Sequence, residues 1–212
     1  MHQIGIGELH QMLIDARRVA DYAQEYCEQL FGSREHTYTL YGPAAYYLGV
    51  SIPSQLTPDR ARALRKKTRR EKYIAYELDS EYKILRTVHI RDHTKAACIF
   101  HHFEIDGISY AFPFHGDTFD FPNSDICIME FANEKPLYYA VASDQLLFVQ
   151  FYEYISGDKM IVSTYRYWPT APFTMHGYPV DREAPIGALN SPVQYHCTEE
   201  VPHVADFSQW FR

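Results

Sequence analysis

The pattern of hydrophobic and polar positions divides the chain into a helical beginning and a β-rich middle. Between residues 8 and 30, apolar residues recur every three or four positions, and charged residues occupy the positions between them. This spacing places the apolar residues on one face of a helix, and Gly32 follows as a helix terminator. The sequence therefore predicts one long amphipathic helix here, followed by a short strand over residues 37–41.

Two further helices are expected before residue 78. Pro43 precedes the run AAYYLG and suits the first turn of a short helix. A longer helix is predicted over residues 56–70, because Thr57 is a suitable N-cap and Pro58 presets the helical φ angle at the first position. Residues 1–78 are thus the helical part of the expected molecule.

After residue 79 the pattern changes to short apolar and aromatic runs separated by turn residues. Runs of this length and composition are typical of strands. The segments 146–155 and 158–167 also satisfy helical spacing, so a helix is the alternative for both. The expected strands are 82–89, 96–105, 108–114, 125–131, 137–142, 146–155 and 160–168.

The strongest local signal is Asp106-Gly107 between two of these runs. Both central residues of a type I′ hairpin turn need a positive φ angle, which Asp tolerates and Gly adopts freely. A two-residue turn pairs Ile105 with Ile108. The same register pairs Phe103 with Tyr110, and that face of the hairpin is predicted to point to the core.

Prolines interrupt the chain repeatedly from residue 169 onward, although aromatic residues such as Trp210 persist there. This part is predicted to be an irregular, Pro-rich strap laid over the domain. In an α+β fold, helices and antiparallel strands occupy separate parts of the chain, as they are predicted to do here. We therefore expect a single α+β domain over residues 1–212, with a helical part (1–78), a mostly antiparallel β-rich part (79–168) and an irregular strap (169–212).

Composition excludes several classes of protein. The 212 residues are 46% hydrophobic and 22% charged, which is ordinary for a globular protein and not for a disordered or fibrous one. No apolar run approaches the ~20 residues of a membrane span, and the first residues lack the basic and apolar regions of a signal peptide. A cytoplasmic protein without membrane association is expected, and its four widely separated cysteines are expected to be free thiols.

Charge is distributed unevenly along the chain. Eight of the 20 basic residues fall within positions 60–72, whereas the whole chain has a net charge of −7. Like charges four residues apart repel on a helix, so the cluster favours contact with an acidic protein surface or a nucleic acid. The net acidity argues against a dedicated nucleic-acid binder, and a merely solvated helix is the alternative. The residues predicted to contact a partner are Arg62, Arg65, Lys66, Arg69, Arg70 and Tyr73.

Histidines suggest a second kind of chemistry. Five of the 11 histidines lie between residues 89 and 115. In the predicted hairpin Cys98 faces His115, and His102 lies on the same face; thiolate and imidazole are zinc ligands. Cys98, His102 and His115 are therefore metal-ligand candidates. Because no standard zinc spacing occurs, histidines satisfied on a half-buried sheet are the simpler interpretation, and no cofactor is predicted.

Two segments show patterns of a known family. Residues 39–53, TLYGPAAYYLGVSIP, contain a small residue followed by an Ala-rich helix ending in Gly, and residues 137–151, LYYAVASDQLLFVQF, read roughly Val-x-Ser-x-x-x-x-Phe-x-Gln. Both resemble segments of AbiEi-type antitoxins and related abortive-infection proteins. Two features differ: the family has Pro-Glu where this chain has Asp144-Gln145. Members of the family also open with a winged helix-turn-helix, whereas this chain opens with one long amphipathic helix. The resemblance implies a non-catalytic protein of phage–host conflict that regulates or neutralises a partner, and a helix over residues 146–155.

These observations favour binding over turnover. We expect an antitoxin- or inhibitor-like binding protein that engages an acidic protein or nucleic-acid surface through its basic helix. The alternative is a metal-assisted hydrolase or nuclease that uses the cysteine, histidines and acids of the central hairpin. A third possibility is a small-molecule or nucleotide binder whose basic cluster holds phosphates.

Overall fold

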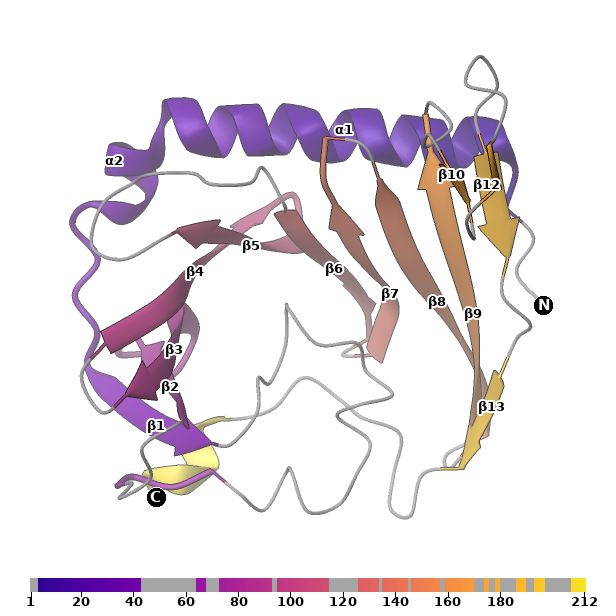
Figure 1. The fold of residues 1–212 in the computed structure, drawn as a ribbon. Helices are drawn as coiled ribbons and strands as arrows, with labels where there is room; N and C mark the ends of the chain where they lie inside the picture. The colour runs from indigo at the N-terminus through magenta and orange to yellow at the C-terminus, as the bar shows by residue number, and fades with distance from the viewer. Residues whose placement is uncertain are drawn as a thin grey trace.

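The computed structural model describes most of the chain between residues 4 and 212 and shows an α+β fold in which strands predominate (Figure 1). The described residues are 4–42, 64–67, 73–92, 95–114, 126–133, 135–144, 146–156, 159–169, 174–175, 178–179, 186–189, 193–196 and 207–212. Helix α1 (Ile6–Glu25) and the short helix α2 (Cys27–Phe31) precede the strands. No helix among these residues is long and apolar enough to cross a membrane.

The described strands form one antiparallel sheet of 11 strands and a separate small hairpin. Strands β1 to β9 follow the same order in the sheet as in the chain, and β12 and β13 both pair with β9. The strands of the sheet are β1 (Tyr38–Gly42), β2 (Tyr73–Leu78), β3 (Ile84–Asp92), β4 (Lys95–Ile105), β5 (Ile108–Phe114), β6 (Ile126–Ala132), β7 (Lys135–Ala142), β8 (Leu147–Ser156), β9 (Lys159–Trp168), β12 (Ile186–Leu189) and β13 (Val193–His196). The hairpin is β10 (Thr174–Met175) with β11 (Tyr178–Pro179), and the 3₁₀ helix η1 (Phe207–Trp210) follows.

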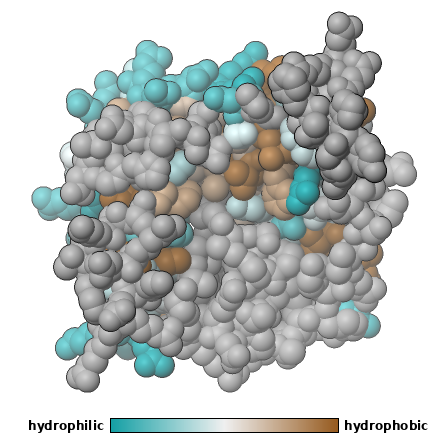
Figure 2. Space-filling model, in the orientation of Figure 1, coloured by the Kyte–Doolittle hydropathy of each residue, from teal (hydrophilic) through white to brown (hydrophobic). Residues whose placement is uncertain are grey.

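Helix α1 packs across one face of the sheet, with the spacing that the sequence predicts. Its small buried residues let the helix approach the strands closely, and they meet Phe112, Leu147 and Tyr167 from the sheet. Hydrophilic residues lie along the outer side of the helix, at the top of Figure 2. The predicted helix is interrupted at Tyr26 and ends at Gly32. The buried residues of α1 are Leu9, Leu13, Ala16, Ala20 and Ala23.

The β4–β5 hairpin confirms the register that the turn residues predict. Ile105 pairs with Ile108, and Phe103 with Tyr110. The faces of the sheet are buried on both sides at this point, because Phe103 packs beneath α1 whereas Ala111 belongs to a second hydrophobic cluster on the opposite face. The hydrophobic core therefore covers both faces of the sheet and not only the face that α1 covers.

A third hydrophobic cluster joins the first strands of the sheet to the C-terminal segment. Leu40 of β1, Tyr76 of β2 and Phe207 of η1 belong to it, together with Leu64. Phe207 is 5% exposed and stacks near Tyr76, with ring centroids 6.3 Å apart. The C-terminal segment is thereby held against the first strands of the sheet.

The expectation for the segment before residue 78 is wrong in two described places. Residues 73–78, assigned to the helical part, form strand β2 because Ile74, Tyr76 and Leu78 alternate toward one buried side. Residues 64–67, assigned to the basic helix, are not helical: Arg65 forms an isolated β-bridge with Tyr41, and Lys66 lies in a bend. The remainder of that helix and the short helix after Pro43 lie outside the described residues.

Two further expectations are corrected. Residues 147–156 form strand β8, so the helix that the antitoxin resemblance implies for residues 146–155 is wrong and the strand is confirmed. The C-terminal strap is less irregular than its prolines indicate, because β12 and β13 extend the sheet beyond β9. Backbone pairing with β9 overrides the local turn signals there.

Candidate functional site

Three consecutive cations lie along the outer edge of the sheet. Arg65, Lys66 and Lys67 are all exposed. Arg65 is fixed by two backbone hydrogen bonds to Tyr41 of β1: its N–H donates to the Tyr41 carbonyl at 2.9 Å, and its carbonyl accepts from the Tyr41 N–H at 2.8 Å. We call this surface the basic edge, defined by Arg65, Lys66, Lys67, Tyr38, Tyr82 and Phe211.

The aromatic residues of the basic edge pack against one another. Tyr38 and Tyr82 stack with centroids 4.8 Å apart, and Phe211 lies 4.6 Å from Tyr38 and 5.5 Å from Tyr82. Lys66 covers Phe211, with Nζ 5.2 Å from the ring centroid, a cation–π contact. The ring faces are thus largely occupied by other groups of the protein.

Tyr82 reaches this cluster because of the tight turn between β2 and β3. Its φ angle is 65°, in the left-handed region. The Asp79 carboxylate holds the turn by accepting hydrogen bonds from the backbone N–H groups of Glu81 at 2.8 Å and Lys83 at 2.9 Å. An Asp side chain that bonds the backbone two residues on is a common turn device.

The structure brings together only part of the predicted partner-contact set. Arg65 and Lys66 lie on the basic edge, and Tyr73 begins β2, where its ring meets Tyr41 edge-on at 5.5 Å. The remaining predicted residues, Arg62, Arg69 and Arg70, lie outside the described residues.

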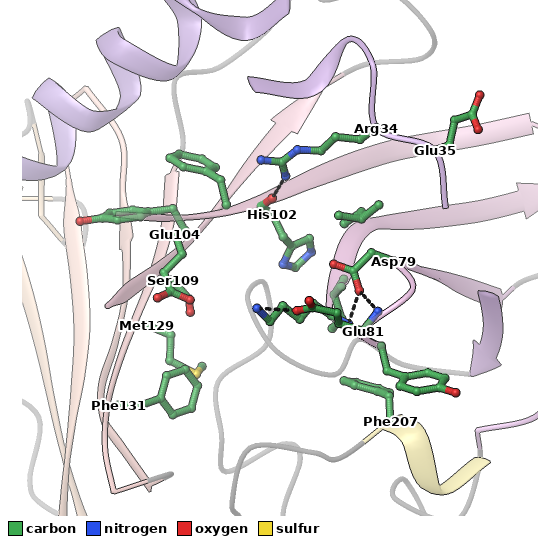
Figure 3. A pocket seen from close by; sticks show the side chains of 16 residues that line it. Arg34, Glu35, Asp79, Glu81, His102, Glu104, Ser109, Met129, Phe131 and Phe207 are labelled. Carbon is green, nitrogen blue, oxygen red and sulfur yellow. Dashed lines mark hydrogen bonds and ion pairs between the residues drawn. The ribbon is translucent and has the colours of Figure 1, made fainter. Parts of the chain in front are cut away.

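A pocket of about 900 Å³ opens beside the basic edge and shares Tyr82 with it (Figure 3). Its walls come from distant parts of the chain: the connection from α2 to β1, the β2–β3 turn, the β4–β5 hairpin and β6. Phe207 of η1 completes the lining. A concave site of this size with a few polar groups is typical of ligand-binding sites.

The histidine pair of β4 is buried and held neutral. His102 is 7% exposed, and its Nε2 lies 2.6 Å from the Thr87 hydroxyl. Burial lowers the pKa of His102 to about 3 and that of His101 to about 4. His101 points to the opposite face, where its ring lies 4.8 Å from that of Phe31.

Arg34 connects these histidines to the pocket. Its guanidinium donates to the His102 carbonyl at 2.6 Å, as Figure 3 shows, and lies 5.6 Å from the Phe31 ring centroid. Burial lowers the Arg34 pKa from its usual high value, and the Asp79 carboxylate opposes that effect. Arginine keeps its proton under these conditions, so the pocket contains a fixed positive charge.

The metal-ligand candidates do not converge in the described part of the chain. Cys98 and His102 lie on the same face of β4 but four residues apart, which is roughly 13 Å along a strand. Cys98 pairs with His89 of β3 instead. His115 lies outside the described residues, and no group of three or more His, Cys, Asp or Glu residues among those described is placed to hold a metal ion.

Sequence reasoning did not find the pocket. Its lining ranges from Arg34 to Phe207, and neither lies near a motif. The local signal was the Asp106-Gly107 turn, whose predicted register sets the β4–β5 hairpin but does not reveal what that hairpin faces. Long-range strand order is what assembles this site.

Comparison with known proteins finds no relative: no family model, no curated protein and no solved structure matches the chain. The resemblance to AbiEi-type antitoxins therefore stays a prediction, and the function must be argued from the basic edge and the pocket themselves.

Proposed function

We propose that the protein acts by binding, and that the basic edge holds an acidic segment of a partner protein. The observation that supports this most directly is the exposure of Arg65, Lys66 and Lys67 in a short segment that Arg65 fixes to β1. The ion pairs seen among the described residues lie elsewhere, at Arg17, Arg18, His36, Lys83 and Arg86. Exposed cations gathered in this way attract carboxylates.

An acidic protein segment fits this surface better than a nucleic acid. Binding of single strands relies on open aromatic faces for base stacking, whereas Tyr38, Tyr82 and Phe211 stack on one another and Lys66 covers the last. The net charge of −7 also opposes a long polyanion. A short acidic segment responds mainly to nearby charges, because salt screens interactions beyond about 8–10 Å.

Capture of an acidic partner agrees with an inhibitor- or antitoxin-like role, which the family resemblance implies. The function requires no chemistry at the surface, only charge complementarity and a fixed edge. The partner's contribution is then a run of Asp or Glu residues presented in an accessible segment.

Charge reversal on the basic edge tests the proposal. The variant Lys66→Glu/Lys67→Glu is compared with Arg18→Glu/Arg166→Glu, which changes the net charge equally at two exposed positions on α1 and β9. Tagged proteins are incubated with nuclease-treated lysate, and the captured proteins are quantified by mass spectrometry. We expect the first variant to lose the dominant partner about tenfold or more, because two attractive contacts become repulsive, and the second to retain it.

Two outcomes would contradict this function. Equal capture by the wild type and the basic-edge variant would remove the basic edge from the interaction. Capture that occurs only without nuclease would show that nucleic acid is the bound polyanion.

A further inference from the structure

The pocket beside the basic edge has a chemistry of its own. Met129 of β6 belongs to the lining without any surface exposed to solvent, and Phe131 of the same strand forms a hydrophobic floor. Glu104 and Ser109, a cross-strand pair of the β4–β5 hairpin, lie side by side above it in Figure 3. An acidic group above an aromatic ring is a favourable environment for an organic cation.

Three of the four carboxylates in the lining are already engaged or directed elsewhere. The Asp79 carboxylate accepts two backbone hydrogen bonds, and Glu81 forms an ion pair with Lys83 at 3.1 Å. Glu35 points away from the pocket in Figure 3. Glu104 is therefore the carboxylate with capacity to bind a ligand.

His102 adds a buried polar atom on the same side. More than nine-tenths of this residue is buried, yet it lines the pocket, and Figure 3 shows its ring directed inward. Thr87 engages Nε2 only. The second ring nitrogen, Nδ1, makes no hydrogen bond within the described part of the chain, so a ligand has a polar contact there besides Glu104.

The charge of the lining favours a cation. With Glu35 directed away, three carboxylates and two cations, Arg34 and Lys83, remain in the lining, and burial keeps His102 neutral. Arg34 is turned to the His102 carbonyl and Lys83 to Glu81, so both positive groups have partners. A ligand anion would meet a net negative wall, whereas an ammonium group would meet a complementary one.

We propose that this pocket binds a small organic amine, with its ammonium group on the Glu104 carboxylate and its hydrophobic body against Phe131. The volume of about 900 Å³ is within the range of small-molecule sites. This binding site shares Tyr82 with the basic edge, but none of the three cations of the basic edge belongs to its lining, so the two sites can be tested separately.

Three probes that share the phenylethyl group test the proposal on the full chain: 2-phenylethylamine, 2-phenylethanol and 3-phenylpropionate. Titrations are followed by the methyl signals of ¹³C-methionine-labelled protein, in which Met129 reports on the floor of the pocket. We expect the amine to shift the Met129 signal and to bind about tenfold more tightly than the alcohol, as one charge-assisted hydrogen bond provides. The carboxylate probe should be the weakest of the three.

Glu104→Gln is expected to lower the amine affinity about tenfold, to that of the alcohol. Glu35→Gln is the matched control, because Glu35 belongs to the same lining but points away, and it should leave the affinity unchanged. Thermal unfolding confirms that each variant folds. Any of three results would overturn the proposal. The carboxylate probe could bind more tightly than the amine, Glu104→Gln could bind the amine as tightly as the wild type, or the Met129 signal could stay unmoved when the amine is added. Lys66→Glu/Lys67→Glu should bind the amine normally, which separates this test from that of the partner surface.

Discussion

At the scale of single residues, backbone conformation decides how the sheet turns. Asp106 and Gly107 have φ angles of 51° and 79°, the values a two-residue type I′ hairpin needs. Asn133 and Tyr82 also have positive φ angles, of 49° and 65°. Asn tolerates this region well, whereas for Tyr it is unusual and is maintained by the turn that Asp79 holds.

Substitution of two glycines by alanine should change stability in opposite directions. A Cβ at Gly107 meets no atom within 4 Å, so Gly107→Ala costs only backbone strain at φ 79°, about 1 kcal/mol. A Cβ at Gly7 in α1 also meets nothing, and there Ala favours the helix by up to about 1 kcal/mol. Urea unfolding of both variants measures the two changes in the free energy of unfolding. Equal effects of the two substitutions would show that the turn imposes no strain.

The histidine pair should make stability depend on pH. Folded His101 and His102 have pKa values of about 4 and 3, below the ordinary 6.5. Below pH 6.5 the unfolded chain therefore takes up protons that the folded chain does not, and the free energy of unfolding falls as pH decreases. The slope approaches about 1.4 kcal/mol per pH unit for each histidine.

Urea unfolding between pH 7 and pH 5 measures this slope. Most carboxylates titrate at a lower pH, so they contribute little to the slope in this window. His102→Gln keeps a polar group beside Thr87 but removes one titrating site, so the decrease should be smaller in the variant. An identical slope in both proteins would mean that His102 is not held neutral by the fold.

At the scale of elements, α1 owes its place to its pattern of small and large buried residues. Alanines at positions 16, 20 and 23 allow close contact with the sheet, and Leu9 and Leu13 anchor the first half of the helix. The outer face carries the charges, including Arg17, which donates to the Asp144 carbonyl beyond the end of β7. Burial of the apolar face supplies most of the stabilisation of such a helix.

Truncation at this interface should be costly. Leu13 is 1% exposed, so Leu13→Ala leaves a cavity and should lower the free energy of unfolding by about 2–5 kcal/mol. Gln24→Ala, at an exposed position of the same helix, should change it by less than about 0.5 kcal/mol. Denaturant midpoints compare the two. A small effect at Leu13 would indicate that α1 is a peripheral element.

At the scale of the whole molecule, the C-terminal strands protect an edge of the sheet. Ile186–Leu189 pairs with one stretch of β9 and Val193–His196 with another. Without them, the N–H and C=O groups of β9 on that side would form an open edge, and open edges pair with other chains.

Removal of these strands should therefore cause self-association. A variant lacking residues 186–212 is compared with one lacking only 207–212, which retains both strands but loses the packing of η1. Sedimentation velocity over a range of concentrations should show larger species for the first variant than for the second. The same sedimentation for both would show that the edge of β9 needs no cover.

The sequence by itself determined the local features of this protein. Periodicity located α1, and the turn residues Asp106-Gly107 set the hairpin and its register, because both depend on interactions between residues close in the chain. Strand β2 was missed, since the basic residues before Tyr73 suggested a helix and its alternation of buried residues covers only 73–78.

Only the tertiary structure decided where the proposed binding surfaces lie. The position of residues 64–67 beside β1 depends on backbone pairing of Arg65 with Tyr41, and β12 and β13 depend on β9. The pocket joins Glu104 to Met129 and Phe131, which the order of strands brings together. Pairing between segments far apart in the chain satisfies backbone hydrogen-bonding groups and buries side chains. Patterns of residues close in the chain cannot predict which distant segments pair.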